Sequence, residues 1–534
     1  MTYLIKSELN GIQDFIFNIK NKGAAKALKA RSFMLDAVCH LIEEIYCCAF
    51  KDSIKIFTGG GNVYLEIKEK EWDEAKFRKL SKEIQKQLIP FHVSFCITYE
   101  IYHDKKNFGQ FIKALNEKLN REKLRFGNND NSIFETWSDK NKNQQVFINF
   151  SKTYSENTSY RISEFNGEQG KIIVENEIRL LDKKLALNKN ENTLLIPLPL
   201  WNDTLLKKYS DLIDKLRDES DKDYTEPKDK NIIGFEYLAG FAKARTGTDN
   251  IGVLKLDVDN LGKLFQQLDD RKNNEKLSKA IKEFFSIGII SLLNEKLDSE
   301  IFKENIYTVY AGGDDCFFIG AWDAVIEFAI RLQKRFSEFE IKLRKDLPVF
   351  KNPVTLSGAI IIVDPHFPVV RFAEIAEDDL KAAKGKKREG KADASGEAMK
   401  NNISFMGHVF TWEEFYELVA VKNTMNEMIT KWGESKAFLQ RIIHSFENND
   451  TIYWHKCKPA KPFNPAILWR FLYSFRDLRH KDYFSKNYYD IFFSETRGYY
   501  HKYVWKQFSP GKELSQVMPV AARWTELLTR NKNQ

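Results

Sequence analysis

Residues 307–318 have the sequence YTVYAGGDDCFF, in which two β-prone segments flank a Gly-Gly turn. This pattern predicts a β-hairpin that carries the carboxylates of Asp314 and Asp315 at its turn. Upstream, residues 253–260 (VLKLDVDN) form a strand-like run that leads into an amphipathic helix, and Asp257 lies near the end of that run. A strand, a helix and a hairpin therefore follow one another, with acidic residues where the strand ends and where the hairpin turns.

The residues after the hairpin complete the order of elements. Their hydrophobic spacing predicts a helix over 324–343, a strand over 354–363 and another helix over about 370–384. Strand–helix–strand–strand–helix–strand connectivity is typical of an antiparallel ferredoxin-like sheet, the palm architecture. In that order the first strand lies beside the hairpin, so we expect Asp257 to lie against the Gly-Gly-Asp-Asp turn.

The same unit occurs earlier in the chain. Residues 3–11 (YLIKSELNG) form a strand-like run, and residues 55–65 (KIFTGGGNVYL) have the hairpin pattern. The spacings nearly match, because Glu8 to Gly61 is 53 positions and Asp257 to Asp314 is 57. Where the later copy of the repeat has three aspartates, the earlier copy has only Glu8, Gly61 and Asn62. We therefore expect two palms, of which only the second holds metal ions.

The predicted class is α+β, with two ferredoxin-like palms of the kind seen in GGDEF cyclases. The expected parts are a degenerate first palm over 1–115, a helical or mixed middle domain with linker over 116–235, a catalytic second palm over 236–412 and a helical C-terminal domain over 413–534. The glycine-containing segment 388–402 predicts a mobile loop.

The composition is that of a cytoplasmic globular protein. Of 534 residues, 43% are hydrophobic and 30% are charged, which allows several buried cores. Apolar runs are too short to span a bilayer, and no export signal is evident. None of the six cysteines forms a CxxC pair, so reduced thiols and no zinc site are expected. A net charge of +8 is compatible with a nucleic-acid partner.

The second palm has the residue types that nucleotidyl transfer requires. Such transfer needs Mg²⁺ or Mn²⁺ held by hard oxygen ligands and a close backbone approach to the triphosphate of a nucleotide such as ATP. The candidate metal-binding residues are Asp257, Val258, Asp314 and Asp315, and the three aspartates are the candidate catalytic residues. The candidate nucleotide-binding residues are Gly312, Gly313, Asn260 and Lys384.

Each feature has a structural alternative. An Asp-x-Asp at a strand end and a Gly-Gly-Asp-Asp turn are each compatible with a solvated turn, but their joint placement in a palm favours a site. Lys384 could hold a triphosphate or simply cap its helix. His103 and Asp104 do not indicate a nuclease, because such sites need several clustered histidines and aspartates. A loop dipeptide is the favoured interpretation.

The sequence resembles the large cyclase-polymerase subunit of type III CRISPR complexes, the Csm/Cmr family, and its Csm branch in particular. The matching stretches are GIQDFIF (11–17), ARSF (30–33), GGGN (59–62), LDVDNLG (256–262), YAGGDD (310–315) and IGAWD (319–323). The resemblance implies a crRNA-guided complex in which target RNA switches on the second palm, which then joins ATP into cyclic oligoadenylates. It also implies that Asp257, Asp314 and Asp315 bind metal and that Lys384 contacts phosphate.

Two departures from the family pattern are expected. The first palm begins at Met1, so no HD nuclease domain precedes it, and no cysteine lies between His103 and Phe235 for a zinc insertion. The same site could instead join AMP to another acceptor such as S-adenosylmethionine. A stand-alone GGDEF-like cyclase and a scaffold with a dead site are further alternatives, which the duplicated palm and the intact aspartates argue against.

Beyond residue 415, aromatic and basic residues alternate along the C-terminal domain. Most of the aromatic residues are expected in a helical core. Arg476 and Arg479 are expected on a surface that faces the other subunits of a complex and its guide–target duplex.

Overall fold

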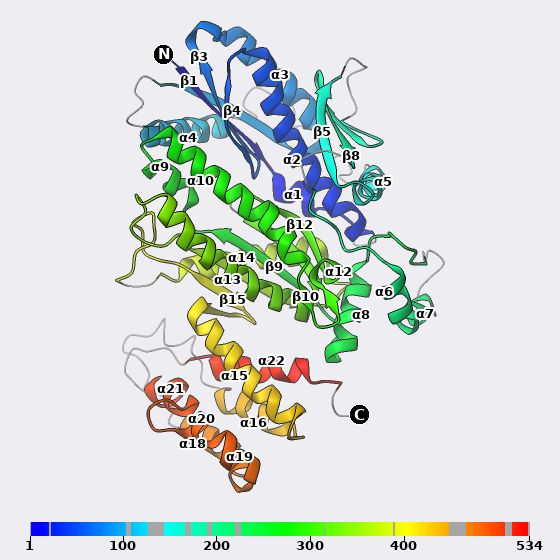
Figure 1. Ribbon diagram of the computed structural model, residues 1–534, viewed down its shortest axis with the longest axis vertical. Helices are drawn as coiled ribbons and strands as arrows, with labels where there is room; N and C mark the ends of the chain where they lie inside the picture. The colour runs from blue at the N-terminus through cyan, green and yellow to red at the C-terminus, as the bar shows by residue number, and fades with distance from the viewer. Residues whose placement is uncertain are drawn as a thin grey trace. The chain divides into compact units, whose positions relative to one another are not determined.

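The computed structural model is of the predicted α+β class and has two compact units, Met1–Phe241 with Asn250–Asn401, and Ala242–Asp249 with Asn402–Gln534 (Figure 1). The described residues are 2–20, 23–102, 108–125, 144–165, 172–189, 195–218, 226–313, 315–387, 390–447, 466–507 and 515–531. Within these residues, no helix has both the length and the apolar character needed to cross a bilayer.

The first palm is a four-stranded antiparallel sheet with the order β2-β3-β1-β4. Its strands are β1 (Thr2–Asn10), β2 (Ile54–Gly59), β3 (Asn62–Lys68) and β4 (Ser94–Tyr102), and its helices are α1 (Ile12–Phe17), α2 (Ala24–Ala49), α3 (Glu74–Leu88) and α4 (Phe108–Arg125). Alternate residues of β1 face opposite sides. Ile5 packs in the main core with α2, whereas Leu4 packs with Phe108 of α4.

The second palm has the same strand order, β12-β13-β9-β14. Its strands are β9 (Ile251–Val258), β12 (Ile306–Gly312), β13 (Asp315–Ala321) and β14 (Leu356–Val363). Helices α9 (Leu261–Gln267), α10 (Arg271–Glu283), α11 (Ile289–Leu293) and α12 (Phe302–Asn305) connect β9 to β12, with the π-helix η4 (Phe284–Gly288) and the short hairpin β10 (Lys296–Leu297) and β11 (Glu300–Ile301) among them. Helix α13 (Trp322–Asp346) connects β13 to β14, and α14 (Val369–Gly385) follows β14. The helices predicted over 324–343 and 370–384 and the strand over 354–363 are thus confirmed.

The two sheets are duplicates in register as well as in order. Glu8 lies opposite Asn62 across β1 and β3, and Asp257 lies opposite Asp315 across β9 and β13. In each palm the first strand therefore pairs with the second strand of the hairpin at the residue that the sequence comparison made equivalent. The predicted internal repeat is confirmed.

The palms pack reciprocally in a pseudo-twofold arrangement. Helix α2 of the first palm contacts β12, and α10 of the second palm contacts β2. The rings of Phe17 and Phe317 lie 4.7 Å apart on one side, and those of Phe57 and Phe265 lie 6.2 Å apart on the other. Each palm thus places its first helices against the sheet of the other.

The two Gly-Gly turns meet where the palms join. Gly313 has a φ of +69°, and a Cβ atom built there would lie 3.3 Å from Cα of Gly60. Such a close approach of two backbones requires glycine. The hairpin predicted around Gly59–Asn62 therefore mirrors the hairpin of the second palm, as expected.

The region between the palms combines helices with a small antiparallel sheet, as expected for a mixed segment. Its elements are α5 (Gln144–Ser155), β5 (Ser159–Glu164), β6 (Ile173–Val174), β7 (Glu177–Leu180), β8 (Lys183–Asn188), α6 (Asp203–Lys208), α7 (Ser210–Asp218) and α8 (Phe235–Thr246). Phe33 of α2 packs against Phe150 and Tyr154 of α5. Up to Phe241 this region belongs to the same compact unit as both palms, whereas the last residues of α8 belong to the second unit.

The four predicted domain ranges stay predictions, but two details of packing bear on their edges. Helix α4 runs across the expected boundary at residue 115 and covers β1 and β4 of the first palm. Segment 390–401 makes polar contacts: Asp393 accepts a hydrogen bond from Asn260, and Ser395 O accepts one from Gln267. These residues form a loop, as expected, and polar partners distant in sequence contact it; its mobility stays a prediction.

The second unit is largely helical, as predicted for the region after Trp412. It contains the hairpin β15 (Asn402–Phe405) and β16 (His408–Thr411) and the helices α15 (Trp412–Thr430), α16 (Ala437–Phe446), α18 (Ala466–Ser474), α19 (Asp482–Asn487), α20 (Tyr489–Phe493), α21 (Tyr499–Tyr503) and α22 (Val517–Leu528). Helix α15 begins with a capping box between Thr411 and Glu414 and packs on α22.

The contact between the palms predicts an asymmetry between two glycines. A Cβ at Gly109 in α4 would lie 1.8 Å from the carbonyl oxygen of Gln266 in α9, whereas one at Gly262 would meet nothing within 4 Å. Gly109→Ala should therefore destabilise the first unit by about 1–3 kcal/mol through overpacking. Gly262→Ala should be close to neutral. Equal urea-unfolding midpoints for the two variants would contradict this packing.

Candidate active site

The candidate site lies at the end of β9, beside the turn of the second palm's hairpin. Asp257 and Asp315 are paired residues on adjacent antiparallel strands, so their side chains share a face of the sheet. Burial raises the pKa of the Cys316 thiol, and the carboxylates of Asp315 and Asp257 raise it further. The two predicted carboxylates are therefore brought together, as the palm order required.

Two ion pairs link the end of β9 to helix α14 beside these carboxylates. Lys384 forms an ion pair with Asp257, and each of the two side chains is about one quarter exposed. Lys255 forms a second ion pair, with Glu377 of α14. Burial of Glu377 opposes its ionisation, but the ammonium of Lys255 outweighs burial and lowers the pKa of the carboxyl. The site therefore combines anionic ligands with a cation, Lys384, at its edge.

The donor set fits a hard divalent cation. Asp257 and Asp315 would hold Mg²⁺ or Mn²⁺ through carboxylate oxygens. The side chain of Val258 is buried, so only its main-chain carbonyl could take part. Asp314 lies outside the described residues, and within those residues no cluster of three or more His, Cys, Asp or Glu side chains forms a metal site. The metal-binding and catalytic assignments stay predictions.

Asp259 has a different role from Asp257, although only one residue separates them. It is 2% exposed and accepts hydrogen bonds from the hydroxyls of Thr355 and Ser357 at 2.9 Å and from the main-chain N–H of Asn401 at 3.1 Å. Burial raises the pKa of Asp259, and these hydrogen bonds oppose the shift. Asp259 thus anchors the end of β9 to β14.

The side chain of Asn260 is occupied by structural contacts. Asn260 has a φ of +56° and precedes α9. Its amide nitrogen donates to Asp393 at 2.7 Å, and its oxygen accepts from Lys400 at 2.9 Å. These contacts turn the amide toward segment 390–401, and the proposed nucleotide contact of Asn260 stays a prediction.

The first palm holds a modified copy of the same arrangement. Glu8 forms an ion pair with Lys123 of α4 at 2.5 Å, the counterpart of Asp257 with Lys384 of α14. Lys6 donates to Asn116 at 2.9 Å, the counterpart of Lys255 with Glu377. The duplicated palms therefore keep the acid–lysine pair, but the first has fewer carboxylates.

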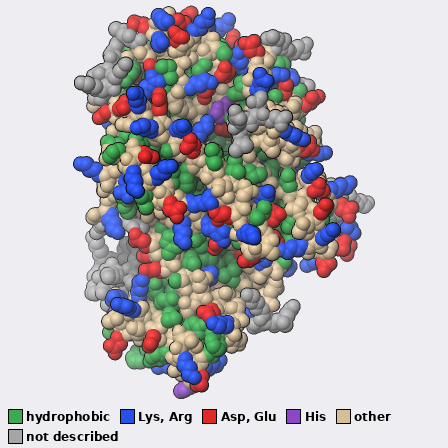
Figure 2. Space-filling view, viewed as in Figure 1, with side chains coloured by type: hydrophobic (Ala, Val, Ile, Leu, Met, Phe, Trp, Pro, Cys, Tyr) green, Lys and Arg blue, Asp and Glu red, His purple; other side chains and the backbone are tan. Residues whose placement is uncertain are grey.

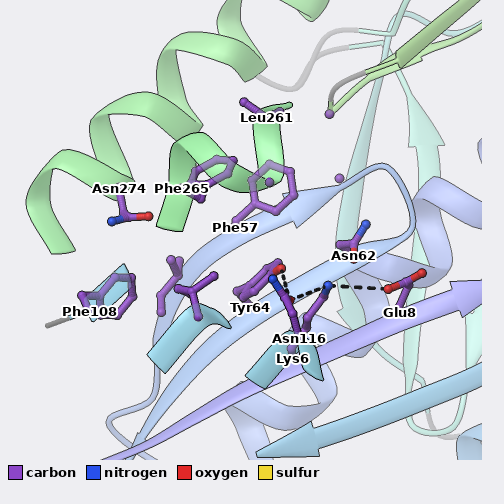
Figure 3. A pocket seen from close by; sticks show the side chains of 15 residues that line it. Lys6, Glu8, Phe57, Asn62, Tyr64, Phe108, Asn116, Leu261, Phe265 and Asn274 are labelled. Carbon is purple, nitrogen blue, oxygen red and sulfur yellow. Dashed lines mark hydrogen bonds and ion pairs between the residues drawn. The ribbon is translucent and has the colours of Figure 1, made fainter. Parts of the chain in front are cut away.

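Two cavities flank the paired Gly-Gly turns, and both palms line each of them. The larger, of about 510 Å³, lies between α1 and α2 of the first palm and the hairpin of the second palm, including Asp315. The smaller, of about 240 Å³, lies between the first palm's sheet, including Glu8, and α9 and α10 of the second palm (Figure 3). Gly59 and Gly313 line both cavities. The pseudo-twofold relation thus extends from the strands to the cavities.

The larger cavity contains polar groups that the sequence did not identify. They are Lys29, Ser32, Asp36 and His40 from α2 and Lys282 and Ser286 near the π-helix η4. Burial lowers the pKa of Lys29 to about 8, against the influence of the Asp36 carboxylate. A buried lysine facing a cavity is a candidate anion ligand. Helical periodicity alone could not distinguish it from a solvated lysine.

The fold and the paired carboxylates define a palm-domain protein, and comparison with known proteins identifies its family. Residues 250–393 match the family model "Cas10/Cmr2, second palm domain", and residues 1–139 match "Csm1 subunit domain B". The chain belongs to the Cas10/Csm1 family. The resemblance inferred from the motifs is confirmed.

The curated relatives are named "CRISPR system single-strand-specific deoxyribonuclease Cas10/Csm1 (subtype III-A)". The protein of Methanocaldococcus jannaschii is 30% identical, over 84% of this chain and 64% of the relative. That of Enterococcus italicus is 23% identical, over 84% of this chain and 60% of the relative. The chain therefore spans about three fifths of the length of these relatives.

Solved structures share the fold. A Csm1-Csm4 cassette in complex with pppApA has a TM-score of 0.67 at 18% identity, covering 99% of this chain and 69% of that chain. A cassette in complex with one ATP has a TM-score of 0.66 at 19% identity, covering 99% and 70%. One with cA4 has a TM-score of 0.67 at 18% identity, covering 99% and 70%. At this identity the likeness establishes the architecture.

The different environments of Asp257 and Asp259 predict different costs of removal. Asp259→Ala leaves two buried hydroxyls and one partly buried N–H without their acceptor and should lower the free energy of unfolding by about 2–4 kcal/mol. Asp257→Ala removes a partly exposed ion pair and should change stability by less than about 1 kcal/mol. Urea unfolding of both variants measures the difference. Comparable destabilisation by the two would contradict the assignment of separate roles.

Proposed function

We propose that this chain is the nucleotide-polymerising large subunit of a type III CRISPR effector complex. It joins ATP molecules through 3′–5′ phosphodiester bonds into cyclic oligoadenylates and releases pyrophosphate when target RNA binds. The observation that carries the proposal is the pairing of Asp257 with Asp315 beside the Gly-Gly turn, where Asp315 lines a cavity shared by both palms. The family assignment and the relatives of the same fold that bind ATP, pppApA and cA4 support the proposal.

The residues around the carboxylates suit a triphosphate. Divalent metal held by Asp257 and Asp315 would neutralise phosphate charge and activate a hydroxyl. Lys384 lies at the edge of the same site and supplies a point charge to phosphate oxygens once nucleotide binding releases it from Asp257. Gly312 leaves open space for the phosphates, because a Cβ atom built there would meet nothing within 4 Å, and Gly313 lets the turn lie against Gly60.

The second cavity gives the reaction a place for its other nucleotide. A 3′-hydroxyl must reach the α-phosphorus of the first nucleotide as the bond to pyrophosphate breaks. Two cavities that meet at Gly59 and Gly313 bring two nucleotides to one point. The first palm then orients a substrate without needing a metal site of its own.

The alternatives raised by the sequence use the same carboxylates differently. Transfer of AMP to S-adenosylmethionine would place that acceptor in one of the two cavities. A stand-alone GGDEF-like cyclase has no use for the first palm, which forms part of both cavities here. The relatives' name refers to cleavage of single-stranded DNA. We expect no such cleavage by this chain, and His103 and Asp104 lie outside the described residues.

The helical second unit has a surface suited to the other subunits and to RNA. Phe471 and Phe475 form its core, whereas Trp469 is 71% and Tyr473 60% exposed. Arg476 stacks on the ring of Tyr473 at 4.8 Å and donates to its hydroxyl at 2.9 Å. Arginine and exposed aromatic residues are enriched at protein and RNA interfaces.

Net charge alone would not identify this surface. On the face that Figure 2 shows, Lys and Arg side chains are interspersed with Asp and Glu, as expected for 83 basic and 75 acidic residues. The proposed RNA and subunit contacts therefore depend on local groups such as Arg476 rather than on one extended basic field.

Removal of either described carboxylate should abolish catalysis. With the reconstituted complex, target RNA, Mg²⁺ and ATP, Asp257→Ala and Asp315→Ala should reduce pyrophosphate release by at least about a thousandfold, because metal-held phosphates lose their ligands. Glu8→Gln in the first palm should retain activity within roughly tenfold. Mass spectrometry with and without S-adenosylmethionine identifies the product. Near-normal turnover by both aspartate variants would refute the proposed site.

Removal of the exposed arginines should affect assembly and activation. The double variant Arg476→Ala/Arg479→Ala should bind the guide–target complex more weakly, and the slope of log affinity against log salt should fall by about one for each phosphate that an arginine no longer neutralises. Lys486→Ala, which removes an exposed cation elsewhere in the unit, is the control. An unchanged affinity and an unchanged salt slope would exclude this surface from RNA contact.

A further inference from the structure

One end of the smaller cavity contains a buried polar atom without a partner. Asn274 in α10 is 2% exposed, and its Oδ1 has no hydrogen-bond partner in the described structure. Its Nδ2 donates to the carbonyl oxygen of Leu268 at 2.7 Å and to that of Asp270 at 3.3 Å. Two carbonyl acceptors fix the nitrogen on that side, because an amide oxygen there would face two acceptors. The oxygen therefore faces away from them, on the side of the cavity.

The surroundings of this oxygen are flat and apolar. Phe57 and Phe265, whose rings lie 6.2 Å apart, line the cavity near Asn274, together with Phe108 and Ile112. Figure 3 shows Asn274 and Phe108 at one end of the pocket and Glu8 and Asn62 at the other. An aromatic wall with one acceptor is the kind of surface that stacks and reads a nucleobase.

The opposite end of the cavity is polar and cationic. Lys6 and Asn116 line it, with the Nζ of Lys6 2.9 Å from Oδ1 of Asn116. Glu8, which also lines this end, forms ion pairs with both Lys6 and Lys123, so two ammonium groups face one carboxylate there. A molecule that spans the cavity would thus place an aromatic ring near Asn274 and an anionic group near the lysines. An extended nucleotide has the same arrangement, with its base at one end and its phosphates at the other.

We propose that Asn274 determines base specificity in the smaller cavity by accepting a hydrogen bond from the exocyclic 6-amino group of adenine. The proposal rests on the proposed function, because it concerns one of the two nucleotides that the palms bring together. Adenine presents an amino donor at position 6, and guanine presents an oxygen acceptor there. Guanine would set two acceptors against each other, and a purine without the 6-substituent would leave the oxygen unpaired.

The unpaired oxygen is costly unless a ligand satisfies it. Native proteins leave few buried polar atoms unpaired, and such an atom in an apolar cavity destabilises the protein. An apolar residue at position 274 would avoid this cost, but could not receive the amino group. A ligand that donates to Oδ1 recovers the hydrogen bond, whereas a ligand without a donor leaves the oxygen unpaired. The cost of the unpaired oxygen therefore becomes a difference in binding free energy between bases.

The test compares ATP with purine riboside triphosphate, which lacks only the 6-amino group. Steady-state turnover by the complex and calorimetric binding to the full chain are measured with both nucleotides and with GTP. For the natural chain we expect ATP to be preferred over purine riboside triphosphate by roughly tenfold to a hundredfold. In Asn274→Ala, ATP should lose this advantage, and the ratio between the two nucleotides should approach one.

Asn273→Ala, an asparagine on the same helix that does not line the cavity, is the matched control and should keep the natural ratio. Equal use of both nucleotides by the natural chain would overturn the proposal without any variant, so a poorly folding Asn274→Ala would not protect it. An unchanged ratio in folded Asn274→Ala would also overturn it. If no polymer forms but calorimetry shows the base preference and its loss in Asn274→Ala, this inference stands and the proposed reaction fails.

Discussion

The close approach of two glycine turns is the constraint on which the rest of the structure depends. A Cβ at Gly313 would lie 3.3 Å from Cα and 3.4 Å from N of Gly60, so the two hairpins meet backbone to backbone. This contact fixes how the sheets face each other, and the first helices of each palm then pack on the other palm. The cavities on either side of the turns follow from the same contact, because open space is left where side chains are missing. The glycines therefore serve the assembly of the site as much as the binding of phosphate.

A difference in charge at matching positions suits the two similar palms to different roles. Both keep a carboxylate at the end of the first strand and a lysine at the end of the helix after the fourth, as Glu8 with Lys123 and Asp257 with Lys384. The second palm adds Asp315 across the strand, where the first has Asn62. An amide in place of a carboxylate lowers the affinity for a divalent cation but leaves the lysines able to attract phosphate. The first palm is therefore better suited to orienting a nucleotide than to holding metal.

Local patterns predicted the elements and the pairing of the carboxylates, because both depend on short-range periodicity and strand order. The helix predicted over 324–343 is Trp322–Asp346, and Asp257 pairs with Asp315 as the palm order required. The sequence did not predict what tertiary packing decides. Helix α4 joins the first palm because it covers one face of its sheet, and segment 390–401 lies beside α9 because Asp393 and Ser395 accept hydrogen bonds from Asn260 and Gln267. Lys29 and Asn274 face cavities that exist only once the palms are packed together.

The Asp257–Asp259 pair shows why an acidic motif needs its backbone to be interpreted. Two residues apart on an ideal strand, both side chains would share a face, and a metal site made from both would be reasonable. Strand β9 ends at Val258, however, so Asp259 lies beyond the strand, and Asn260, with a φ of +56°, turns the chain directly after it. The main-chain N–H of Asp259 donates to the carbonyl of Thr355 at 2.8 Å, and its carboxylate accepts from the hydroxyls of Thr355 and of Ser357 in β14. Burial and hydrogen bonding thus make Asp259 part of the scaffold, and that scaffold leaves Asp257 partly exposed beside the hairpin, where a metal ion and phosphates can reach it.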